Sequence, residues 1–236
     1  MHNMLLSHAM AVDLYRKLYQ AKQGGQIGII PFVFMYEPLR DEECDIQAVN
    51  RALAFYVCWV LDPLVFGEHP QDMRHILGDQ LTRFSPEEKD LVKGSLDFIG
   101  INHYSTLYVK DCTFEACPLG GDRPILGFLN ITGMRDGIPI GDPTAVARFF
   151  VVPRGMEKTV NYLKIRYHNM PMFITENEIR GYTKYVFRTY LAALLRAIRE
   201  GADVRGYFEW TLMDNFEWLN GYNTLFGLLL CGWRDT

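Results

Sequence analysis

The chain has 236 residues, of which 49% are hydrophobic and 22% charged, a composition that is ordinary for a globular protein with one sizeable core. Its formal net charge of −4 gives no electrostatic reason to expect nucleic acid or an anionic membrane surface as a partner. The longest uninterrupted apolar run, residues 52–61, is about half of the roughly 20 residues that a membrane span needs, so it predicts a buried helix and no membrane segment.

The N-terminal residues have the spacing of an amphipathic helix. Apolar side chains recur every three to four positions over residues 2–20, and Gly24-Gly25 ends the pattern. No charged stretch followed by an apolar one is visible before this helix, so no cleavable secretion signal is predicted and the compartment stays open. The side chains expected on the inward face are Leu5, Ala9, Val12 and Tyr19.

A strand and a long helix follow. Residues 26–34 are mostly apolar and predict the first strand, which Pro31 should end because proline cannot donate a ladder hydrogen bond. Asp45 is expected to cap a helix that continues to about Leu61. Pro63 should stop this helix, since proline disrupts a helix interior.

The middle of the chain predicts a short helix, a strand and a long loop. Residues 85–88 (Ser-Pro-Glu-Glu) have the pattern of a capping box with proline at the first helical position, which predicts a helix to Lys93. Residues 95–104 predict the second strand. Residues 111–145 are rich in Gly, Pro and Asp without sustained periodicity, and a loop of that length is usually functional or disordered.

The C-terminal part alternates between helix and strand. Helices are predicted over 155–167 and 182–200, and strands over 171–176 and 204–212. This alternation predicts an α/β fold with parallel strands and helices outside the sheet, and no repeat or linker divides residues 1–236, which are expected to form a single domain. In the helix over 182–200 the side chains expected to face inward are Leu191, Leu194, Leu195 and Ile198.

The five cysteines leave at least one thiol unpaired within the chain. Cys112 and Cys117 lie in a Gly/Pro-rich stretch and could close a small loop as a disulfide, and free thiols are an equally open alternative. The six histidines show no ligand spacing with one another or with a cysteine pair, so no metal site is expected.

One predicted strand ends on an ionisable residue. Residues 171–177 (Pro-Met-Phe-Ile-Thr-Glu-Asn) run from an apolar segment into a carboxylate, and an unpaired buried charge costs several kcal/mol. In α/β architectures ligands bind at the carboxyl ends of the strands. Glu176 is therefore a candidate active-site carboxylate, and the alternative is a strand-end glutamate that simply reaches water.

Three motifs occur in an order typical of one family. I-T-E-N at residues 174–177, G-Y-F-x-W-T-L-x-D-N-F-E-W at residues 206–218 and D-F-I-G-I-N-x-Y at residues 97–104 together resemble family 1 glycoside hydrolases, the β-glucosidase family. The resemblance covers essentially the whole chain and is greatest to plant members. It implies a (β/α)8 TIM-barrel type fold that is incomplete here, with the four strands as strands five to eight and residues 2–20 as the helix after strand four.

The resemblance also implies roles for individual side chains. Glu176 matches the nucleophile that forms a covalent glycosyl intermediate, and Asn102 and Tyr104 match the residues that support it. For the aromatic residues, plain core packing is the alternative. The family further implies a cis peptide bond between residues 210 and 211. The positions that match its substrate-binding residues are Trp210, Glu217, Trp218 and Phe226.

One part of the expected site has no match. A retaining glycosidase needs a second carboxylate about 5 to 5.5 Å from the nucleophile, and in this family that acid/base lies in a T-[FL]-N-E-P motif that is absent from the sequence. Glu178 is a poor substitute because it would approach the sugar from the same side as Glu176. Arg148 stands where many members carry a tryptophan against the aglycone, and arginine can still stack on a planar group.

Two hypotheses about function follow. The first is a β-glucosidase-like hydrolase that removes terminal non-reducing β-D-glucosyl residues with retention, needs no cofactor, takes a β-glucoside as its small-molecule substrate, and has this chain as its C-terminal part. The second is a truncated, inactive relative that keeps part of a sugar-binding site. Because half of a barrel cannot close, the chain alone is expected to be either poorly soluble or dimeric, with self-association through the open half-barrel. Members of this family are often secreted, vacuolar or plastid proteins.

Overall fold

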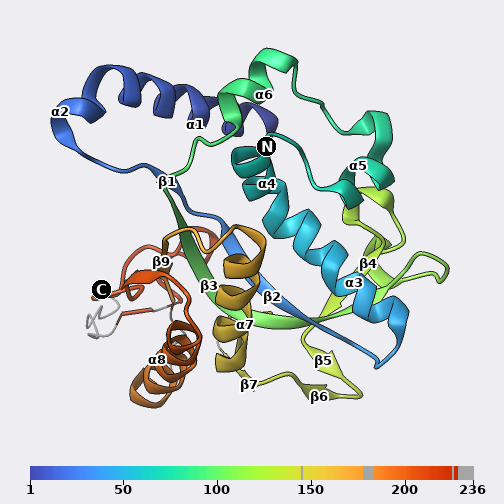
Figure 1. Cartoon of the computed structure of the whole chain (residues 1–236). Coiled ribbons are helices and arrows are strands. Elements are labelled where there is room, and N and C mark those ends of the chain that lie inside the picture. The colour runs from blue at the N-terminus through green and yellow to red at the C-terminus, as the bar shows by residue number, and fades with distance from the viewer. Residues whose placement is uncertain (145, 178–182, 225, 228–236) are drawn as a thin grey trace.

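The computed structural model describes residues 1–144, 146–177, 183–224 and 226–227. A twisted, mostly parallel sheet forms its centre, and helices cover one face of that sheet (Figure 1). The parallel strands follow one another in chain order across the sheet. This arrangement confirms the predicted partial α/β barrel with a parallel sheet.

The register of the sheet brings the end of one strand beside the long central strand. The central strand pairs in parallel with a strand much later in the chain, and Asn102 lies opposite Glu176 where that pairing ends. Helical crossovers between sequential parallel strands produce this order. The strands, in the order of the sheet, are β1 (Gly28–Ile29) and β2 (Phe32–Pro38), which both pair with β3 (Phe98–Asp111), then β9 (Met172–Glu176) and β10 (Val204–Tyr207).

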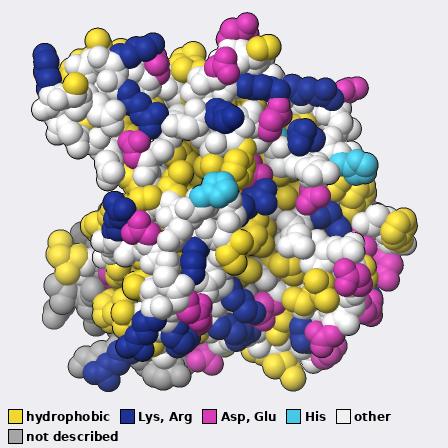
Figure 2. Space-filling view, viewed as in Figure 1, with side chains coloured by type: hydrophobic (Ala, Val, Ile, Leu, Met, Phe, Trp, Pro, Cys, Tyr) yellow, Lys and Arg dark blue, Asp and Glu magenta, His cyan; other side chains and the backbone are white. Residues whose placement is uncertain are grey.

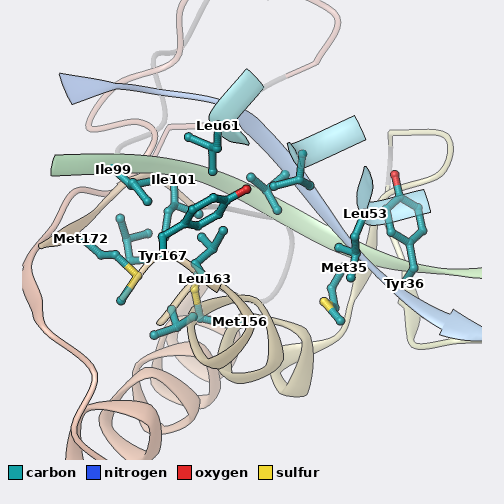
Figure 3. Packing of buried hydrophobic residues seen from close by; sticks show 14 of the residues in the cluster. Met35, Tyr36, Leu53, Leu61, Ile99, Ile101, Met156, Leu163, Tyr167 and Met172 are labelled. Carbon is teal, nitrogen blue, oxygen red and sulfur yellow. The ribbon is translucent and has the colours of Figure 1, made fainter. Parts of the chain in front are cut away.

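The helices bury one face of the sheet. In Figure 3, Ile99 and Ile101 of β3 point toward Leu163 and Met156 of α7, and all four side chains are fully buried. Each buried aliphatic side chain of this size contributes about 1.5–3 kcal/mol relative to exposure, so this layer is the main source of stability. The covering helices are α3 (Glu43–Leu53), α4 (Trp59–Phe66) and α7 (Pro153–Arg166), with α8 (Thr183–Arg199) alongside α7.

The N-terminal helix extends from the body as an arm (Figure 1). α1 (His2–Tyr15) continues through a π-helical turn (Arg16–Gln20) into α2 (Ala21–Gln23), and Gly24 ends the helix in the left-handed conformation at φ 64°. Leu5, Ala9 and Val12 are buried as predicted. The prediction for Tyr19 was wrong, since its side chain is 48% exposed. The π-helical turn changes the residue spacing per turn and rotates Tyr19 away from the buried face.

The long helix differs from its prediction at both ends. It begins at Glu43, and Asp45 is not its N-cap, because the Asp45 carboxylate instead accepts hydrogen bonds from Arg40 and from the backbone N–H of Asp111. A π-helical turn (Ala54–Cys58) connects α3 to α4. Pro63 lies inside α4 and does not stop it, because Leu61 and Leu64 beside it are fully buried and their packing outweighs one lost hydrogen bond.

This helix is also the one described segment that meets the length and composition criteria for a membrane span. It extends from Glu43 to Phe66, and 56% of its most apolar window is buried inside the protein. Burial of this kind is typical of a core helix, which agrees with the prediction for residues 52–61. Gly67, left-handed at φ 82°, ends the helix.

Two strands extend further than predicted, and one is shorter. Pro31 interrupts the first strand without ending it, and the strand resumes as β2 up to Pro38. β3 continues past Tyr104 as far as Asp111 because β2 and β4 provide ladder partners there. β10 ends at Tyr207, short of the predicted residue 212, with a last bond from the Phe208 N–H to the Ile174 carbonyl.

The predicted loop over 111–145 contains short elements. β4 (Leu129–Thr132) adds an antiparallel strand to β3, and the disulfide that the sequence left open joins Cys112 to Cys117. Cys44 and Cys58 are free thiols, and Cys231 lies outside the described residues. Two small antiparallel pairs complete the region, β5 (Met134–Arg135) with β6 (Ile138–Pro139) and β7 (Asp142–Pro143) with β8 (Phe150–Val151).

The remaining helices are short. α6 (Pro86–Val92) begins with the predicted capping box, in which the Ser85 hydroxyl accepts from the Glu88 N–H and the Glu88 carboxylate accepts from the Ser85 N–H. α5 (Gln71–Leu77) precedes it. Single 3₁₀ turns occur at Gly78–Gln80, Pro118–Gly120, Pro124–Leu126 and Trp218–Asn220.

The buried face of α8 differs from the predicted one. Leu194 is buried, but Leu195 and Ile198 are 49% and 36% exposed, so the prediction for these two residues was wrong. Alanines on the contact face let α8 lie close to α7, while Leu195 and Ile198 remain outside that contact. The fully buried residues of that face are Tyr190, Ala193 and Ala197.

The second face of the sheet carries apolar side chains that the described residues leave open. Ile30, Phe32 and Phe208 are 51%, 47% and 58% exposed, while Phe98 and Phe173 pack edge to face with ring centroids 5.1 Å apart. On the side of the molecule drawn in Figure 2, hydrophobic side chains alternate with charged groups of both signs. The two faces of the sheet are thus in different environments.

Candidate active site

A pocket of about 430 Å³ opens where the central strands end. Its position follows from the register, since Tyr104 on β3 and Glu176 at the end of β9 come together at the same edge of the sheet. The carboxyl ends of barrel strands are where barrel enzymes place their chemistry. The lining residues are Phe32, Tyr104, Val146, Phe149, Glu176, Trp210, Glu217, Trp218, Leu219, Asn220 and Phe226.

The shortest polar contact in this pocket joins Tyr104 to Glu176. The Tyr104 hydroxyl donates to Oε2 of Glu176 over 2.6 Å, and the Tyr104 side chain is only 6% exposed. This bond fixes the orientation of the Glu176 carboxylate. Because the bond occupies one carboxylate oxygen, the second oxygen is the one available to a ligand.

Side-chain hydrogen bonds fix the backbone around Glu176. The Thr175 hydroxyl donates to Oδ1 of Asn102 over 2.7 Å, and Nδ2 of Asn177 donates to the His103 carbonyl over 2.6 Å. Both bonds cross from β9 to β3. Asn102 therefore lies beside the nucleophile candidate and joins the strand ends without lining the pocket itself.

Glu217 is the second carboxylate of the pocket. It is 5% exposed and accepts a hydrogen bond from Nε1 of Trp210 over 3.3 Å. Burial raises the pKa of Glu217, the Trp210 and Asn215 donors oppose that rise, and the nearby Glu176 charge adds to it. A buried carboxylate with an indole partner suits the recognition of hydroxyl groups.

The segment after β10 is folded on itself at the mouth of the pocket. The Thr211 N–H donates to the Phe226 carbonyl over 3.1 Å, and the Gly227 N–H donates to Oδ1 of Asp214 over 2.9 Å. The peptide bond between Trp210 and Thr211 is cis, as the resemblance implied. Phe226 is nearly buried by this arrangement, whereas Trp218 is 81% exposed and forms an open wall.

Aromatic rings that the sequence did not single out line one side of the pocket. The Phe149 ring stacks on Tyr104 with centroids 5.2 Å apart, and Phe32 stacks on Tyr104 at 5.8 Å. Phe32 lies within the strand predicted over 26–34, and Phe149 directly follows Arg148 in the sequence. The signal that could have found Phe32 is its place immediately after Pro31, where the strand is interrupted, opposite Asn102.

One further carboxyl group was missed. Burial raises the pKa of Glu209 to about 7, although the Tyr207 hydroxyl donates to its Oε2 over 2.7 Å and opposes that rise. The same hydroxyl lies 2.9 Å from Oδ1 of Asn177. Glu209 does not line the pocket with Glu176, so its carboxyl group is not placed to exchange a proton with a molecule bound there.

The structure gathers six of the seven predicted site residues in one pocket and places Asn102 just behind it. Glu178 lies outside the described residues. Within the described part of the chain no group of three or more His, Cys, Asp or Glu side chains could hold a metal ion. The arrangement offers a positioned carboxylate, a second buried carboxylate and aromatic walls, which together could hold a sugar ring and attack it.

Comparisons of the sequence with known proteins agree with this chemistry. The profile of Glycosyl hydrolase family 1 matches residues 1–235. The chain is 46% identical to a probable inactive β-glucosidase of rice, covering 96% of this chain and 47% of that protein. It is 41% identical to a coniferin β-glucosidase of Pinus contorta, again covering 96% and 47%. The chain thus spans about half the length of the curated relatives it matches.

Solved structures extend the likeness to three dimensions. A rice β-glucosidase mutant in a covalent complex with Glc superposes with a TM-score of 0.93 at 37% identity, covering 99% of this chain and 52% of that one. A Humicola insolens β-glucosidase in complex with glucose superposes with a TM-score of 0.90 at 35% identity, covering 98% and 52%. The half-barrel therefore has the shape of the matching half of these enzymes.

Proposed function

The chain belongs to glycosyl hydrolase family 1, and from this premise we propose that its pocket is the nucleophile side of a retaining β-glucosidase site. The substrate class is a glycoside, and we assign terminal non-reducing β-D-glucosyl residues as its sugar. The observation that carries the proposal is the 2.6 Å hydrogen bond from Tyr104 to Glu176 in a pocket that also holds Glu217 and Trp210.

The first chemical step assigns a role to each of these groups. The free oxygen of Glu176 bonds to the anomeric carbon while the bond from that carbon to the leaving oxygen breaks, which gives a glycosyl ester and releases the leaving oxygen as an anion with the bonding electron pair. Tyr104 orients the attacking carboxylate through its hydrogen bond. Glu217 and Trp210 bind hydroxyl groups and the ring face, and so fix the anomeric carbon against Glu176.

A fluorinated substrate tests this step without a general acid. In 2-deoxy-2-fluoro-β-D-glucosyl fluoride the carbon–fluorine bond at the anomeric centre breaks, fluoride leaves without a proton, and the 2-fluorine slows hydrolysis of the ester. Intact-mass and peptide analysis should find one fluoroglucosyl group on Glu176. Glu176→Gln should take no label, and Tyr104→Phe should slow labelling about ten- to a hundredfold.

A matched control and a contrary outcome complete this experiment. Tyr19→Phe removes a hydroxyl from an exposed tyrosine on the N-terminal arm and should label at the unchanged rate. Label on any other carboxylate, or equal labelling of the Glu176→Gln variant, would show that Glu176 is not the nucleophile.

A second candidate function has its own support. A relative that covers 96% of this chain is named as probably inactive. In that case the pocket binds a sugar without turning it over. Two results would favour this binding function over the enzyme. Calorimetry would detect glucose binding that Glu217→Gln abolishes, and the unchanged chain would take no fluoroglucosyl label.

For partners, we propose that the isolated chain pairs with a second copy of itself through the open face of the sheet. Ile30, Phe32 and Phe208 are about half exposed there, and exposed apolar patches of this kind mark association surfaces. Within the described residues, β1 and β2 on one side and β10 on the other have ladder partners on one flank only. Strands with a free flank add to the tendency to associate.

A further inference from the structure

A second cavity adjoins the pocket of Glu176. It measures about 340 Å³, and Phe32 and Phe149 line both cavities, so the two share a wall. The remaining side chains of the second cavity come from β2, from the π-helical turn, from β4 and from the segment before β8. They are Phe34, Tyr36, Tyr56, Ile131, Ala147 and Arg148.

Aromatic rings lead from the nucleophile into this cavity. Tyr104 donates to Glu176, Phe149 stacks on Tyr104 with centroids 5.2 Å apart, and Phe34 meets Phe149 edge to face at 5.7 Å. A group bonded to the anomeric carbon leaves on the side of the sugar away from the attacking oxygen, and this cavity shares a wall with the pocket that holds that oxygen. Stacking on such walls favours a flat, aromatic leaving group.

The π-helical turn supplies the far wall. Tyr56 lies within the turn Ala54–Cys58, and its ring lies 6.0 Å from that of Tyr36. An extra residue in a helical turn displaces side chains from the regular pattern, and such turns occur often at functional sites. Here Tyr56 lines the cavity, while its neighbour Phe55 is buried.

Arg148 gives the cavity a positive charge. Among the described residues no carboxylate lies within 4 Å of its guanidinium, and none of the residues lining the cavity is acidic. Burial raises the pKa of Tyr56, and the charge of Arg148 works against that rise. Arg148 and Tyr56 both line this cavity.

We propose that this cavity is the leaving-group subsite and selects planar aromatic aglycones that carry a carboxylate. The rings of Phe34 and Phe149 stack on the aglycone, and the guanidinium of Arg148 pairs with its carboxylate in the two-pronged geometry that carboxylates fit. Tryptophan at this position would stack on neutral rings, whereas arginine adds the charge preference. This inference rests on the proposed glucoside site and names the substrate class of that site.

Binding, and not turnover, tests the inference, because binding does not need the general acid. The two probes are 4-carboxyphenyl β-D-glucoside and its neutral isostere 4-carbamoylphenyl β-D-glucoside, titrated into the 236-residue chain by calorimetry at low salt. We expect the carboxylate to bind about two- to fivefold more tightly, the scale of one exposed charge pair. The ratio should fall toward one as salt is raised, since ions screen an exposed pair.

Variants separate this inference from the sugar site. Arg148→Gln should bring the ratio of the two dissociation constants to about one, while Arg148→Lys should keep part of the preference without the two-pronged contact. Glu217→Gln should weaken both probes equally and leave their ratio unchanged. A ratio near one in the unchanged chain, or a ratio that survives Arg148→Gln, would overturn the carboxylate preference.

The free aglycones show which proposal fails. If the sugar site is assigned wrongly, Glu217→Gln will not weaken the glucosides, yet 4-hydroxybenzoate should still outcompete 4-hydroxybenzamide in an Arg148-dependent way. If the subsite is assigned wrongly, the glucosides will bind in a Glu217-dependent way with no preference between the two aglycones. The two results cannot be confused.

Discussion

The two faces of the β-sheet have the same kinds of apolar side chains and opposite environments. On the helix-covered face, Ile101 and Ile174 are fully buried, whereas on the other face Ile30 and Phe208 are 51% and 58% exposed. The covered face obtains its partners from helices that follow each strand in the sequence. The open face would face the interior of a closed barrel, where its partners come from strands across the barrel.

This difference shows which packing in the barrel depends only on neighbouring parts of the chain. Each strand and its helix form a unit whose packing is complete in half a barrel, which is why the superposition on whole enzymes has a TM-score of 0.93. The site lies at the boundary between the two kinds of packing. Glu176 and Tyr104 are held by strand pairing, while the sugar would lie against the open side.

The largest effect is expected from deleting volume on the covered face. Ile101→Ala should destabilise the chain by about 3 to 4 kcal/mol, because a fully buried aliphatic side chain leaves a cavity between β3 and α7. Ile30→Ala is the matched change on the open face and should cost less than about 1 kcal/mol. Urea unfolding at low protein concentration measures both, and equal costs would show that the open face is covered.

A titration is expected to produce a change of similar size on the covered face. His103 is fully buried between β3 and α7, and burial lowers its pKa from 6.5 to about 4 even though the Val33 carbonyl opposes that shift. Between these two values the unfolded chain binds a proton that the folded chain does not. Stability should therefore fall as the pH drops from about 6.5 to 4, by on the order of 3 kcal/mol from this group.

A variant isolates the contribution of this histidine. His103→Gln should flatten the dependence of the unfolding free energy on pH within that window, measured by urea titration at each pH. Part of the slope should persist, because burial also lowers the pKa values of His8 and His69. An unchanged slope in the variant would contradict a neutral, buried His103.

The sequence predicted the local units better than the contacts between them. Glu176, Tyr104, Glu217 and Trp210 were found because motifs preserve the residues at strand ends, and the parallel sheet followed from the alternation of helix and strand. Pro63 was misinterpreted because its cost is local, while the burial of Leu61 and Leu64 that compensates for it is tertiary. An error at the end of a strand leaves the alternation of its side chains unchanged. In a helix, a local irregularity changes which face every later side chain occupies.

The walls of the site were harder to predict for the same reason. Phe32 and Phe149 are 117 positions apart in sequence, and only the fold brings them to one pocket. Tyr19 shows the opposite failure, in which a π-helical turn shifted the side chain out of a face that regular spacing predicted. Residue types alone predict neither the π-helical turn nor the proximity of Phe32 and Phe149.

A buried ion pair on the covered side is expected to give an intermediate effect. Asp62 of α4 is 3% exposed and accepts hydrogen bonds from the guanidinium of Arg166 and from the Tyr167 hydroxyl, the latter over 2.8 Å, which ties α4 to α7. Asp62→Asn should cost about 2 kcal/mol, because it leaves the Arg166 charge without its counterion. Asp13→Asn in the exposed pair with Lys17 is the control and should change stability by less than about 0.5 kcal/mol.

The smallest effect on stability, with a large effect on association, is expected on the open face. Ile30→Thr combined with Phe208→Ser replaces two half-exposed apolar side chains by polar ones, so the free energy of unfolding should change by less than about 1 kcal/mol. Self-association should weaken, because the variant removes much of the exposed apolar surface that a second copy would cover. Sedimentation velocity over a concentration series measures this change.

Leu195→Thr, on the exposed side of α8 and away from the sheet, is the matched control and should leave association as it is. A chain that is already monomeric, with one cooperative unfolding transition, would show that the half-barrel is stable with its inner face in water.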